Sequence, residues 1–467
     1  MREVPDIPSV FGAMHAASRR DQLPPWTVRA DRLERLRRLL TENHERIAQA
    51  IHDDFGNRPR QETALLEMFP SLAAIDDGLR HGKRWMRERR VATGFWFRPG
   101  RSRLLPQPLG VVGIVVPWNY PLYLTVGPLA GVLAAGNRAM VKLSEYTPRF
   151  AALFAELVQA EFAPDEIVIV NGDAEVASAF SALPFDHLLF TGSTAVGHHV
   201  MRAAAANLTP VTLELGGKSP AIVGPGADLG RAVERILVGK LMNAGQTCIA
   251  PDYVLVPDDL REPLVQAMRA CVGRLYPDLA RNPDYTSIIS ARHFARLQGL
   301  VDDAAAQGAR VVPLSETGHD AAARRMTPTL LLDVPESATA MREEIFGPVL
   351  PVVTYQTIDQ ALDYINARPR PLALYLFERD RHTIGHVMRQ TVAGGVTVND
   401  TLFHIAQDNL PFGGVGASGM GVYHGKAGFE TFSKLKPVFH QAGLNGAGLL
   451  KPPYGKTFAS MLKLLLR

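Results

Sequence analysis

Two residues in the sequence are suited to nucleophilic and acid–base chemistry. Cys248 lies in GQTC, a loop that follows a predicted helix over 229–242, with Gly245 in the place of a helix-ending glycine. Most free cysteines are inert core residues, but a cysteine in a loop is placed to act as a nucleophile. Glu214, 34 residues upstream, lies in the otherwise apolar strand of LELGGKSP. Burial would raise the pKa of its carboxyl toward the range of a general base; a buried Glu with satisfied hydrogen bonds is the alternative.

A third candidate residue is an asparagine held between two prolines. PWNYP at 117–121 places Asn119 at the end of a predicted strand over 111–116. Because the prolines fix a rigid excursion, the amide N–H₂ could face a developing oxyanion, although ordinary turn chemistry explains the motif equally well. Tyr120, the next residue, would supply an aromatic wall for a flat substrate ring.

FTGSTAVG at 190–197 has the form of a phosphate-binding turn. A strand over 187–190 runs into Gly192 and Ser193, and a helix over 194–206 begins at once. The free backbone N–H groups and the positive end of the helix dipole suit a phosphate group. Ser193 is also an ordinary helix N-cap, so the motif alone leaves both interpretations open.

VKLSE at 141–145 ends another apolar strand with two charged residues, Lys142 and Glu145. Ligands of doubly wound sheets bind in the crevice at the carboxyl ends of the strands. The Glu145 carboxylate could accept hydrogen bonds from a ribose diol, and the Lys142 ammonium could donate to ribose or phosphate. Solvated surface charge is the alternative interpretation.

The elements that must position these residues alternate along the chain. Short, uniformly apolar runs rich in β-branched residues are separated by helical patterns, which is typical of parallel sheets covered on both faces. Two helical stretches, 25–54 and 61–90, come before this alternation. We therefore predict two α/β domains with doubly wound parallel sheets. Strands are expected at 111–116, 139–143, 167–170, 187–190 and 211–215, and then at 221–223, 253–256, 310–313, 329–333, 350–354, 373–377 and 395–399.

Composition excludes several classes of protein. The 467 residues are 46% hydrophobic and 21% charged, which excludes a disordered, collagen-like or coiled-coil chain. Fifty Lys and Arg against 46 Asp and Glu leave a net charge of +4, so we expect no nucleic-acid partner. The sequence has no HExxH motif and no paired cysteines, so we expect no metal site.

The sequence also predicts the compartment. Cys248 and Cys271 cannot form a disulfide framework, which indicates a reducing environment. The N-terminus has no apolar stretch typical of a secretory signal, so we expect a cytoplasmic protein. The uncharged stretch 104–137 is long enough to cross a bilayer, but five prolines interrupt it, and we expect no integral membrane segment. The apolar, basic tail over 451–467 is expected to form a short helix docked on the body; a membrane-surface anchor is the alternative.

Seven segments resemble, in order, the motifs of the aldehyde dehydrogenase superfamily, and the resemblance covers about residues 25–434. NAGQTCIAPDY at 243–253 and YHGKAGFETFSK at 423–434 are similar to its class-three branch. HIAQDNLPFGGVG at 404–416 is similar to the bacterial coniferyl aldehyde dehydrogenases. The segments are PWNYP, KLSE, FTGSTAVG, LELGGKSP, GQTC, EEIFGP (343–348) and LPFGGVGASGMG (410–421).

This resemblance implies a reaction and a set of roles. An aldehyde would be oxidised to a carboxylic acid with NAD, with NADP also possible. Cys248 would be the nucleophile that passes through a thiohemiacetal and a thioester, and Glu214 would activate the hydrolytic water. Asn119 would stabilise the oxyanion together with the Cys248 backbone N–H. In the cofactor site, Lys142 and Glu145 would hold the adenosine ribose, Gly192 and Ser193 the pyrophosphate, and Glu344 and Phe346 the nicotinamide ribose and ring.

The resemblance also implies a fold and an assembly. Class-three relatives are dimers with a small β-hairpin oligomerisation arm, so a homodimer is expected. The implied substrate is an aromatic aldehyde such as coniferaldehyde, which would give ferulate. The expected divisions are an NAD-binding domain over 1–90 and 109–212, a catalytic domain over 213–421, an arm over 91–108 and 422–446, and a tail over 447–467.

Three other functions stay open. A broad-range enzyme for fatty or aromatic aldehydes would share every motif. A CoA-acylating dehydrogenase would share Cys248 but would use a thiol instead of water, and the presence of Glu214 argues against it. A non-catalytic binding protein would be expected to lack Cys248 or Glu214, and the sequence keeps both.

Overall fold

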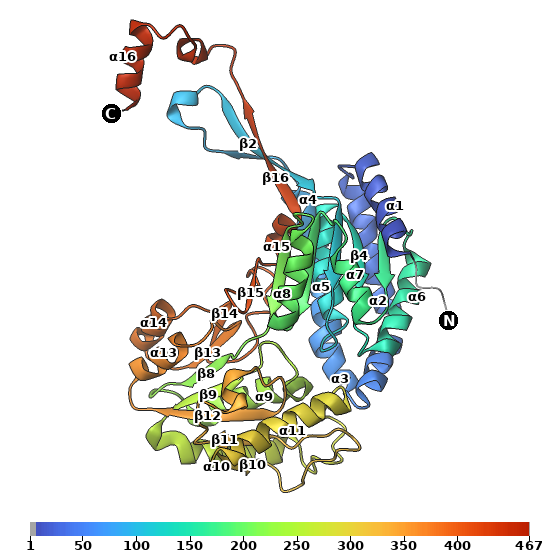
Figure 1. The fold of residues 1–467 in the computed structure, drawn as a ribbon, viewed down its shortest axis with the longest axis vertical. Helices are drawn as coiled ribbons and strands as arrows, with labels where there is room; N and C mark the ends of the chain where they lie inside the picture. The colour runs from blue at the N-terminus through green and yellow to red at the C-terminus, as the bar shows by residue number, and fades with distance from the viewer. Residues whose placement is uncertain (1–5, 467) are drawn as a thin grey trace.

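The computed structural model describes residues 6–466 (Figure 1). Two large sheets, each covered by helices, form the body, and a small third sheet projects from it. Neighbouring strands of the large sheets run parallel except at one edge of each. The predicted α/β class with two parallel-sheet domains is therefore confirmed.

The first large sheet carries the predicted cofactor motifs at the carboxyl ends of its strands. One strand of this sheet crosses the expected domain division between 212 and 213. That strand continues to pair with its neighbour as far as Leu215 opposite Gly192. In spatial order the strands are β15 (Gly419–Met420), β7 (Val211–Leu215), β6 (His187–Gly192), β3 (Val111–Val115), β4 (Arg138–Lys142) and β5 (Ile167–Val170).

Alternating side chains of this sheet pack against different helices on its two faces. Val112 and Ile114 belong to a core cluster shared with the helices of one face, whereas Val111 and Val115 belong to a cluster shared with those of the other. The first face is covered by α2 (Trp26–Phe55), α5 (Tyr123–Ala135) and α6 (Pro148–Glu161). The second is covered by α1 (Ile7–Arg20), α7 (Ala174–Ser181) and α8 (Thr194–Ala205).

The second large sheet has seven strands, and the antiparallel one at its edge is β10. In spatial order they are β10 (Arg310–Pro313), β11 (Thr329–Leu332), β12 (Val349–Tyr355), β9 (Tyr253–Pro257), β8 (Pro220–Val223), β13 (Ala373–Phe377) and β14 (Gly395–Val398). Its helices are α9 (Leu229–Leu241), α10 (Arg261–Leu275), α11 (Ala291–Ala306), α12 (Thr339–Arg342), α13 (Ile358–Asn366) and α14 (Arg381–Gln390), with a short 3₁₀ turn η4 (Asp258–Leu260).

Two helical regions differ from the sequence prediction. Helix α1 was not predicted, although Ile7, Phe11 and Met14 form a buried face at helical spacing. The stretch predicted as one helix over 61–90 is interrupted by a π-helical turn. It consists of α3 (Arg60–Thr63), the π turn η1 (Ala64–Met68) and α4 (Phe69–Trp85).

The projecting sheet is the predicted arm, and it has three strands instead of a simple hairpin. The strands β1 (Arg89–Val91), β2 (Arg101–Pro108) and β16 (Ser433–His440) pair antiparallel, with β2 in the centre. The 3₁₀ turn η2 (Phe95–Phe97) lies in the loop between β1 and β2, and α15 (Gly425–Thr431) precedes β16. Figure 1 shows the arm extending away from both large sheets.

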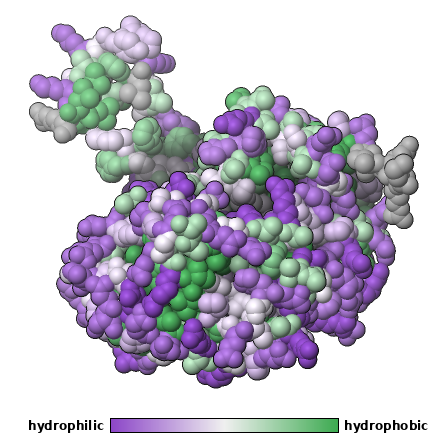
Figure 2. Space-filling model, turned by 60° about the horizontal axis from the view of Figure 1, so that its bottom comes forward, coloured by the Kyte–Doolittle hydropathy of each residue, from purple (hydrophilic) through white to green (hydrophobic). Residues whose placement is uncertain are grey.

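The tail forms a helix, as predicted, but the expectation that it docks on the body is wrong. After the 3₁₀ turn η5 (Ala447–Leu450), α16 (Lys456–Leu465) contains no buried residue. Figures 1 and 2 show the tail beside the arm, in a lobe that stands apart from the body and carries hydrophobic residues on its surface. Over residues 6–466, no helix combines the length and apolar character needed to cross a membrane.

Candidate active site

Three consecutive residues in left-handed backbone conformation turn the chain from α9 into the loop that carries Cys248. Asn243, Ala244 and Gly245 have φ values of 53°, 51° and 77° within and after the turn η3 (Met242–Gly245). A Cβ atom on Gly245 would lie 2.4 Å from the carbonyl oxygen of Gly347. Only glycine therefore fits this close approach, which explains the glycine of GQTC.

The loop is fixed on both sides by side-chain hydrogen bonds to backbone groups. Gln246 donates from Nε2 to the carbonyl of Ser287 (3.1 Å) and accepts at Oε1 from the N–H of Ile289 (2.9 Å). Asn243 donates from Nδ2 to the carbonyls of Gln246 (3.1 Å) and Asn119 (3.0 Å). The buried side-chain amides of Asn243 and Gln246 thus fix the backbone conformation around Cys248.

PWNYP packs directly against this loop, as the predicted roles require. Asn119 is 3% exposed, and its Nδ2 donates to the carbonyl of Gln246 (3.2 Å), two residues before Cys248. The Tyr120 hydroxyl lies 2.6 Å from Oγ1 of Thr247. Tyr120 is buried, so most of its ring packs inside the protein. The structure brings Asn119, Tyr120 and Cys248 together.

A buried charge cluster that sequence reasoning missed holds PWNYP in place. Arg58 is fully buried; its Nη1 donates to the carbonyl of Asn119 (3.0 Å) and lies 2.9 Å from a carboxylate oxygen of Glu67. Glu67, in the π turn η1, accepts from the N–H groups of Leu122 (2.7 Å) and Tyr123 (3.1 Å). Burial raises the pKa of Glu67, while Arg58 and these N–H groups oppose the shift.

A second acid of the same region fixes the Cys248 loop. Glu62 accepts from the N–H of Asn243 (2.7 Å) and from the hydroxyl of Thr286. Its carboxylate also lies 3.9 Å from Nε of Arg58. The i, i+4 spacing of Arg58 and Glu62 was visible in the sequence, but such pairs usually lie on a solvated helix face. Burial of both partners could not be read from the spacing.

Glu214 lies in β7 with neither carboxylate oxygen hydrogen-bonded to the protein. The side chain is 2% exposed, and burial alone raises its pKa well above the ordinary value. Burial also raises the pKa of the Cys248 thiol, and the negative charges of Glu344 and Glu214 raise it further. Both carboxyl groups therefore lie close enough to the Cys248 thiol to affect its pKa.

Glu344 and Phe346 come from the loop between α12 and β12. A Cβ atom on Gly216 would lie 2.0 Å from the Glu344 carboxylate, so the glycine leaves room for this side chain. The Gly217 N–H donates to the carboxylate, but burial dominates and raises its pKa to about 8. Phe346 has φ 54° and packs edge-on against Trp118, with ring centroids 5.4 Å apart.

The remaining candidate residues lie at the carboxyl edge of the first sheet. Lys142 is buried, and its ammonium donates to the carbonyls of Leu143 (2.7 Å) and Gly172 (2.8 Å). Burial lowers the pKa of Lys142, and the nearby charge of Glu145 opposes this shift. Glu145 itself is exposed. Ser193 is the N-cap of α8 and accepts from the N–H of Val196 (3.4 Å), and Gly192 ends β6 just before it.

A cavity of about 460 Å³ reaches from the start of α8 to Glu344. Its lining includes Thr194, at the start of α8, together with Gly216, Gly217 and Glu344. One carboxylate oxygen of Glu344, Oε1, is shielded from solvent and has no hydrogen-bond partner. A helix start suits a phosphate, and a free carboxylate oxygen suits a ribose hydroxyl, so this lining fits a dinucleotide.

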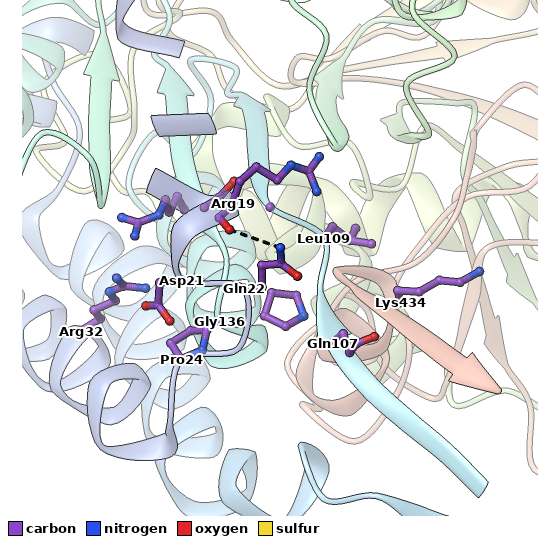
Figure 3. A pocket seen from close by; sticks show the side chains of 13 residues that line it. Arg19, Asp21, Gln22, Pro24, Arg32, Gln107, Leu109, Gly136 and Lys434 are labelled. Carbon is purple, nitrogen blue, oxygen red and sulfur yellow. Dashed lines mark hydrogen bonds between the residues drawn. The ribbon is translucent and has the colours of Figure 1, made fainter. Parts of the chain in front are cut away.

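Another cavity, of about 210 Å³, lies between the α1–α2 connection and the base of the arm (Figure 3). Its three arginines are each paired with an acid. Arg19 lies 3.0 Å from Asp186, and Arg32 lies 2.9 Å from Glu166. The third pair joins Arg138 to Asp165 at 3.1 Å. We therefore assign this cavity a structural role. Within the described part of the chain, no group of three or more His, Cys, Asp or Glu side chains could hold a metal ion.

The Arg58 cluster predicts a large stability effect. Arg58→Met leaves the buried Glu67 carboxylate without its cation, so we expect the free energy of unfolding to fall by about 3–5 kcal/mol. Arg60→Met is the matched control, since Arg60 is two residues away and exposed. Urea denaturation of the two variants and the parent measures the difference. Equal stability of the two variants would contradict a supporting role for Arg58.

Comparison with known proteins agrees with this geometry. Residues 3–438 match the model of the aldehyde dehydrogenase family. The chain is 50% identical over 467 residues to a probable coniferyl aldehyde dehydrogenase of Pseudomonas aeruginosa, covering 100% of this chain and 98% of that protein. It is 49% identical to a coniferyl aldehyde dehydrogenase of a Pseudomonas species (strain HR199), covering 94% of this chain and 92% of that protein.

Solved structures give the same result. A substrate-bound Staphylococcus aureus AldH is 37% identical, with a TM-score of 0.93 over 98% of this chain and 99% of that one. Betaine aldehyde dehydrogenase of the same species, in complex with NAD⁺, is 25% identical, with a TM-score of 0.84 over 95% and 89%. Matches of this extent in sequence and in fold lead to one assignment: this chain belongs to the aldehyde dehydrogenase family and oxidises aldehydes to carboxylic acids with NAD or NADP.

Proposed function

We propose that Cys248 is the nucleophile, Asn119 the oxyanion donor and Glu214 the general base of this oxidation. The single observation that supports the assignment best is that the buried, unpartnered Glu214 carboxyl lies close enough to the partly exposed Cys248 thiol to raise its pKa. Asn119 uses one N–H of Nδ2 on the Gln246 carbonyl, which leaves the second N–H for an alkoxide.

The proposed steps follow from these positions. The thiolate of Cys248 adds to the aldehyde carbon, and the alkoxide of the thiohemiacetal accepts hydrogen bonds from Asn119 and the Cys248 backbone N–H. Bound NAD or NADP supplies the hydride acceptor, and oxidation leaves a thioester on Cys248. Glu214 then takes a proton from water as the water oxygen adds to the thioester, and the acid leaves with release of the Cys248 sulfur.

In the cofactor site, the proposed contacts keep the roles expected from the sequence. Glu145 and Lys142 would bind the adenosine ribose, Ser193 with Gly192 the pyrophosphate, and Glu344 with Phe346 the nicotinamide ribose and ring. The cavity between Thr194 and Glu344 supports this arrangement because it joins the phosphate position to the ribose position. Glu145 is exposed and negative at its end of the site, which favours NAD over NADP.

We infer an aromatic substrate of the arylpropenal class, such as coniferaldehyde, which gives ferulate. Support comes from the names of the two Pseudomonas relatives and from the aromatic side chain of Tyr120 beside Asn119. A broad-range enzyme for fatty or aromatic aldehydes is the second candidate.

We further propose a cytoplasmic homodimer, with catalytic and NAD-binding domains divided as the motifs suggest. The exposed aromatic residues of the arm support the dimer: Phe95 (74%), Trp96 (59%) and Phe97 (60%) need a covering surface.

The first prediction separates the roles of Cys248 and Glu214. Glu214→Gln removes the base for hydrolysis, so we expect a burst of about one NADH per active site and then a steady rate lowered about 10²–10⁴-fold. A hydroxylamine-sensitive acyl-enzyme should accumulate, whereas Cys248→Ser should show neither burst nor turnover. Stopped-flow mixing with saturating aldehyde and NAD measures both. An unaltered steady rate in Glu214→Gln would remove this residue from the mechanism.

The second prediction concerns cofactor preference. Glu145 should repel a 2′-phosphate, so the parent enzyme should have a higher kcat/KM for NAD than for NADP. Glu145→Gln removes the charge and should raise kcat/KM for NADP about tenfold, which corresponds to about 1.4 kcal/mol. Glu175→Gln, an exposed acid on α7, serves as the control. The assignment of Glu145 fails if the kcat/KM of the parent enzyme for NADP equals or exceeds its kcat/KM for NAD.

The third prediction concerns the substrate. For the parent enzyme we expect kcat/KM to be at least about tenfold higher with coniferaldehyde than with hexanal, because a flat aromatic pocket gains binding energy only from the ring. Steady-state rates over a series of aliphatic, benzylic and cinnamyl aldehydes provide the measurement. A clear preference for hexanal would support the broad-range alternative.

The fourth prediction concerns assembly. The double variant Trp96→Ser, Phe97→Ser removes the apolar tip of the arm and should convert a particle of twice 51.0 kDa into a monomer. Leu208→Ser, which alters an 89% exposed side chain on the body, should stay dimeric. Light scattering coupled to size-exclusion chromatography reports the mass. A double variant that stays dimeric would exclude the tip of the arm from the interface.

A further inference from the structure

Ile345 lies between the two residues that are proposed to bind the nicotinamide half of the cofactor. Glu344 comes before it and Phe346 after it, in the loop between α12 and β12. Phe346 has a left-handed backbone conformation (φ 54°), which a bulky side chain rarely adopts. Such a conformation persists only where the surrounding structure fixes the chain. The groups that bind the backbone of this loop therefore decide where both cofactor residues point.

The N–H of Ile345 is bound by a buried acid. Asp252 is 3% exposed, and its Oδ1 accepts from this N–H (3.0 Å). The other carboxylate oxygen accepts from the ammonium of Lys218. Lys218 also donates to the carbonyls of Ala340 (2.7 Å) and Glu343 (3.1 Å), which precede Ile345 in the chain. Two charged side chains thus bind the backbone on the N-terminal side of the loop.

The carbonyl of Ile345 is bound by an arginine of α11. Arg296 donates from Nη1 to the carbonyl of Glu344 (3.3 Å) and from Nη2 to the carbonyl of Ile345. A guanidinium suits two successive carbonyls because its donors form a rigid, planar fork. The next residue of the helix also touches the loop, since a Cβ atom on Gly347 would lie 2.4 Å from Cδ2 of Leu297. Helix α11 therefore lies directly against the cofactor loop.

We propose that Arg296 is a positioning residue for the nicotinamide half of the cofactor: with Asp252 it binds both polar backbone groups of Ile345 and so fixes the residues on either side. The proposal rests on the proposed cofactor roles of Glu344 and Phe346. Without Arg296, two carbonyls of the loop lose this donor, and the chain can relax from the left-handed conformation at Phe346. Arg296 acts through the backbone and does not touch the cofactor.

The charge of Arg296 has a second effect that must be separated from positioning. Burial raises the pKa of Glu344, and the positive charge of Arg296 opposes this shift and favours the ionised carboxylate. A lysine at position 296 keeps the charge but lacks the planar pair of donors. Positioning therefore predicts that Arg296→Lys behaves like Arg296→Met. A purely electrostatic role predicts that Arg296→Lys behaves like the parent.

The experiment measures the binding of NAD and of ADP to the full chain by calorimetry, without aldehyde. ADP lacks the nicotinamide half, so it should contact only the adenosine and phosphate positions. Arg296→Met and Arg296→Lys should each raise the Kd for NAD about tenfold or more and leave the Kd for ADP within about twofold of the parent value. Arg292→Met is the matched control, because Arg292 is exposed on the first turn of α11, and it should change neither Kd.

A double-variant cycle tests whether Arg296 acts through Glu344. Glu344→Gln should also weaken NAD binding and spare ADP binding. Combined with Arg296→Met, it should raise the Kd for NAD by less than the product of the two separate fold-changes, because both variants disturb the same contact. Fold-changes that multiply would show that Arg296 does not act through Glu344.

Each other outcome overturns the proposal. An unchanged Kd for NAD in Arg296→Met removes the positioning role, and parent-like NAD binding by Arg296→Lys reduces that role to charge. An equal rise of both Kd values, or failure of both Arg296 variants to fold, assigns Arg296 to the fold; if only Arg296→Met fails to fold, Arg296→Lys decides.

Glu344→Gln separates this proposal from the proposed function. If Glu344→Gln weakens NAD binding and Arg296→Met does not, only the role of Arg296 is wrong. If Glu344→Gln leaves NAD binding unchanged, the proposed cofactor role of Glu344 is wrong, and the role of Arg296 falls with it.

Discussion

The proposed chemistry depends on two groups that have no counter-ion of the protein within bonding distance. Neither oxygen of Glu214 has a hydrogen-bond partner. Burial and the neighbouring carboxylates raise the pKa of the Cys248 thiol. Groups in this state cannot fix their own positions through strong bonds. The positions of the reacting atoms must therefore be set by the surrounding structure, and the buried cluster of Arg58, Glu62 and Glu67 provides this support.

The two-sheet architecture brings the supports to the same point. The residues proposed to bind the adenosine ribose and the pyrophosphate follow the carboxyl ends of strands in the first sheet, whereas Cys248 and Glu344 follow elements of the second. Glycines permit the close contact between them, because Gly216 leaves space for the Glu344 carboxylate and Gly245 for the Gly347 carbonyl. The same feature that specifies the fold, an apolar strand ending at a polar loop, thus specifies the site.

Much of this could be predicted from the sequence, and the failures have physical reasons. Short apolar strands predicted the parallel sheets, and the motifs predicted the side chains that meet around Cys248, whereas the arm was expected only from the resemblance to the family. Burial of a charged residue could not be read from spacing, so Arg58 was missed. Helix α1 was missed although its buried face recurs at helical spacing, and the tail was expected on the body although none of its helix residues is buried there.

The central claim, that the Glu214 carboxyl is desolvated and unpartnered, can be tested by infrared difference spectroscopy of the parent against Glu214→Gln. An ordinary Glu is ionised above its pKa of about 4.3, so its protonated C=O band is absent at about pH 6. The account predicts that the parent at that pH shows a protonated carboxyl band, shifted by D₂O, that is weaker in Glu214→Gln. The band that remains in this variant is that of Glu344, whose pKa burial raises to about 8. An ionised Glu214 at pH values just above about 4.3, with no such band lost in Glu214→Gln, would contradict it.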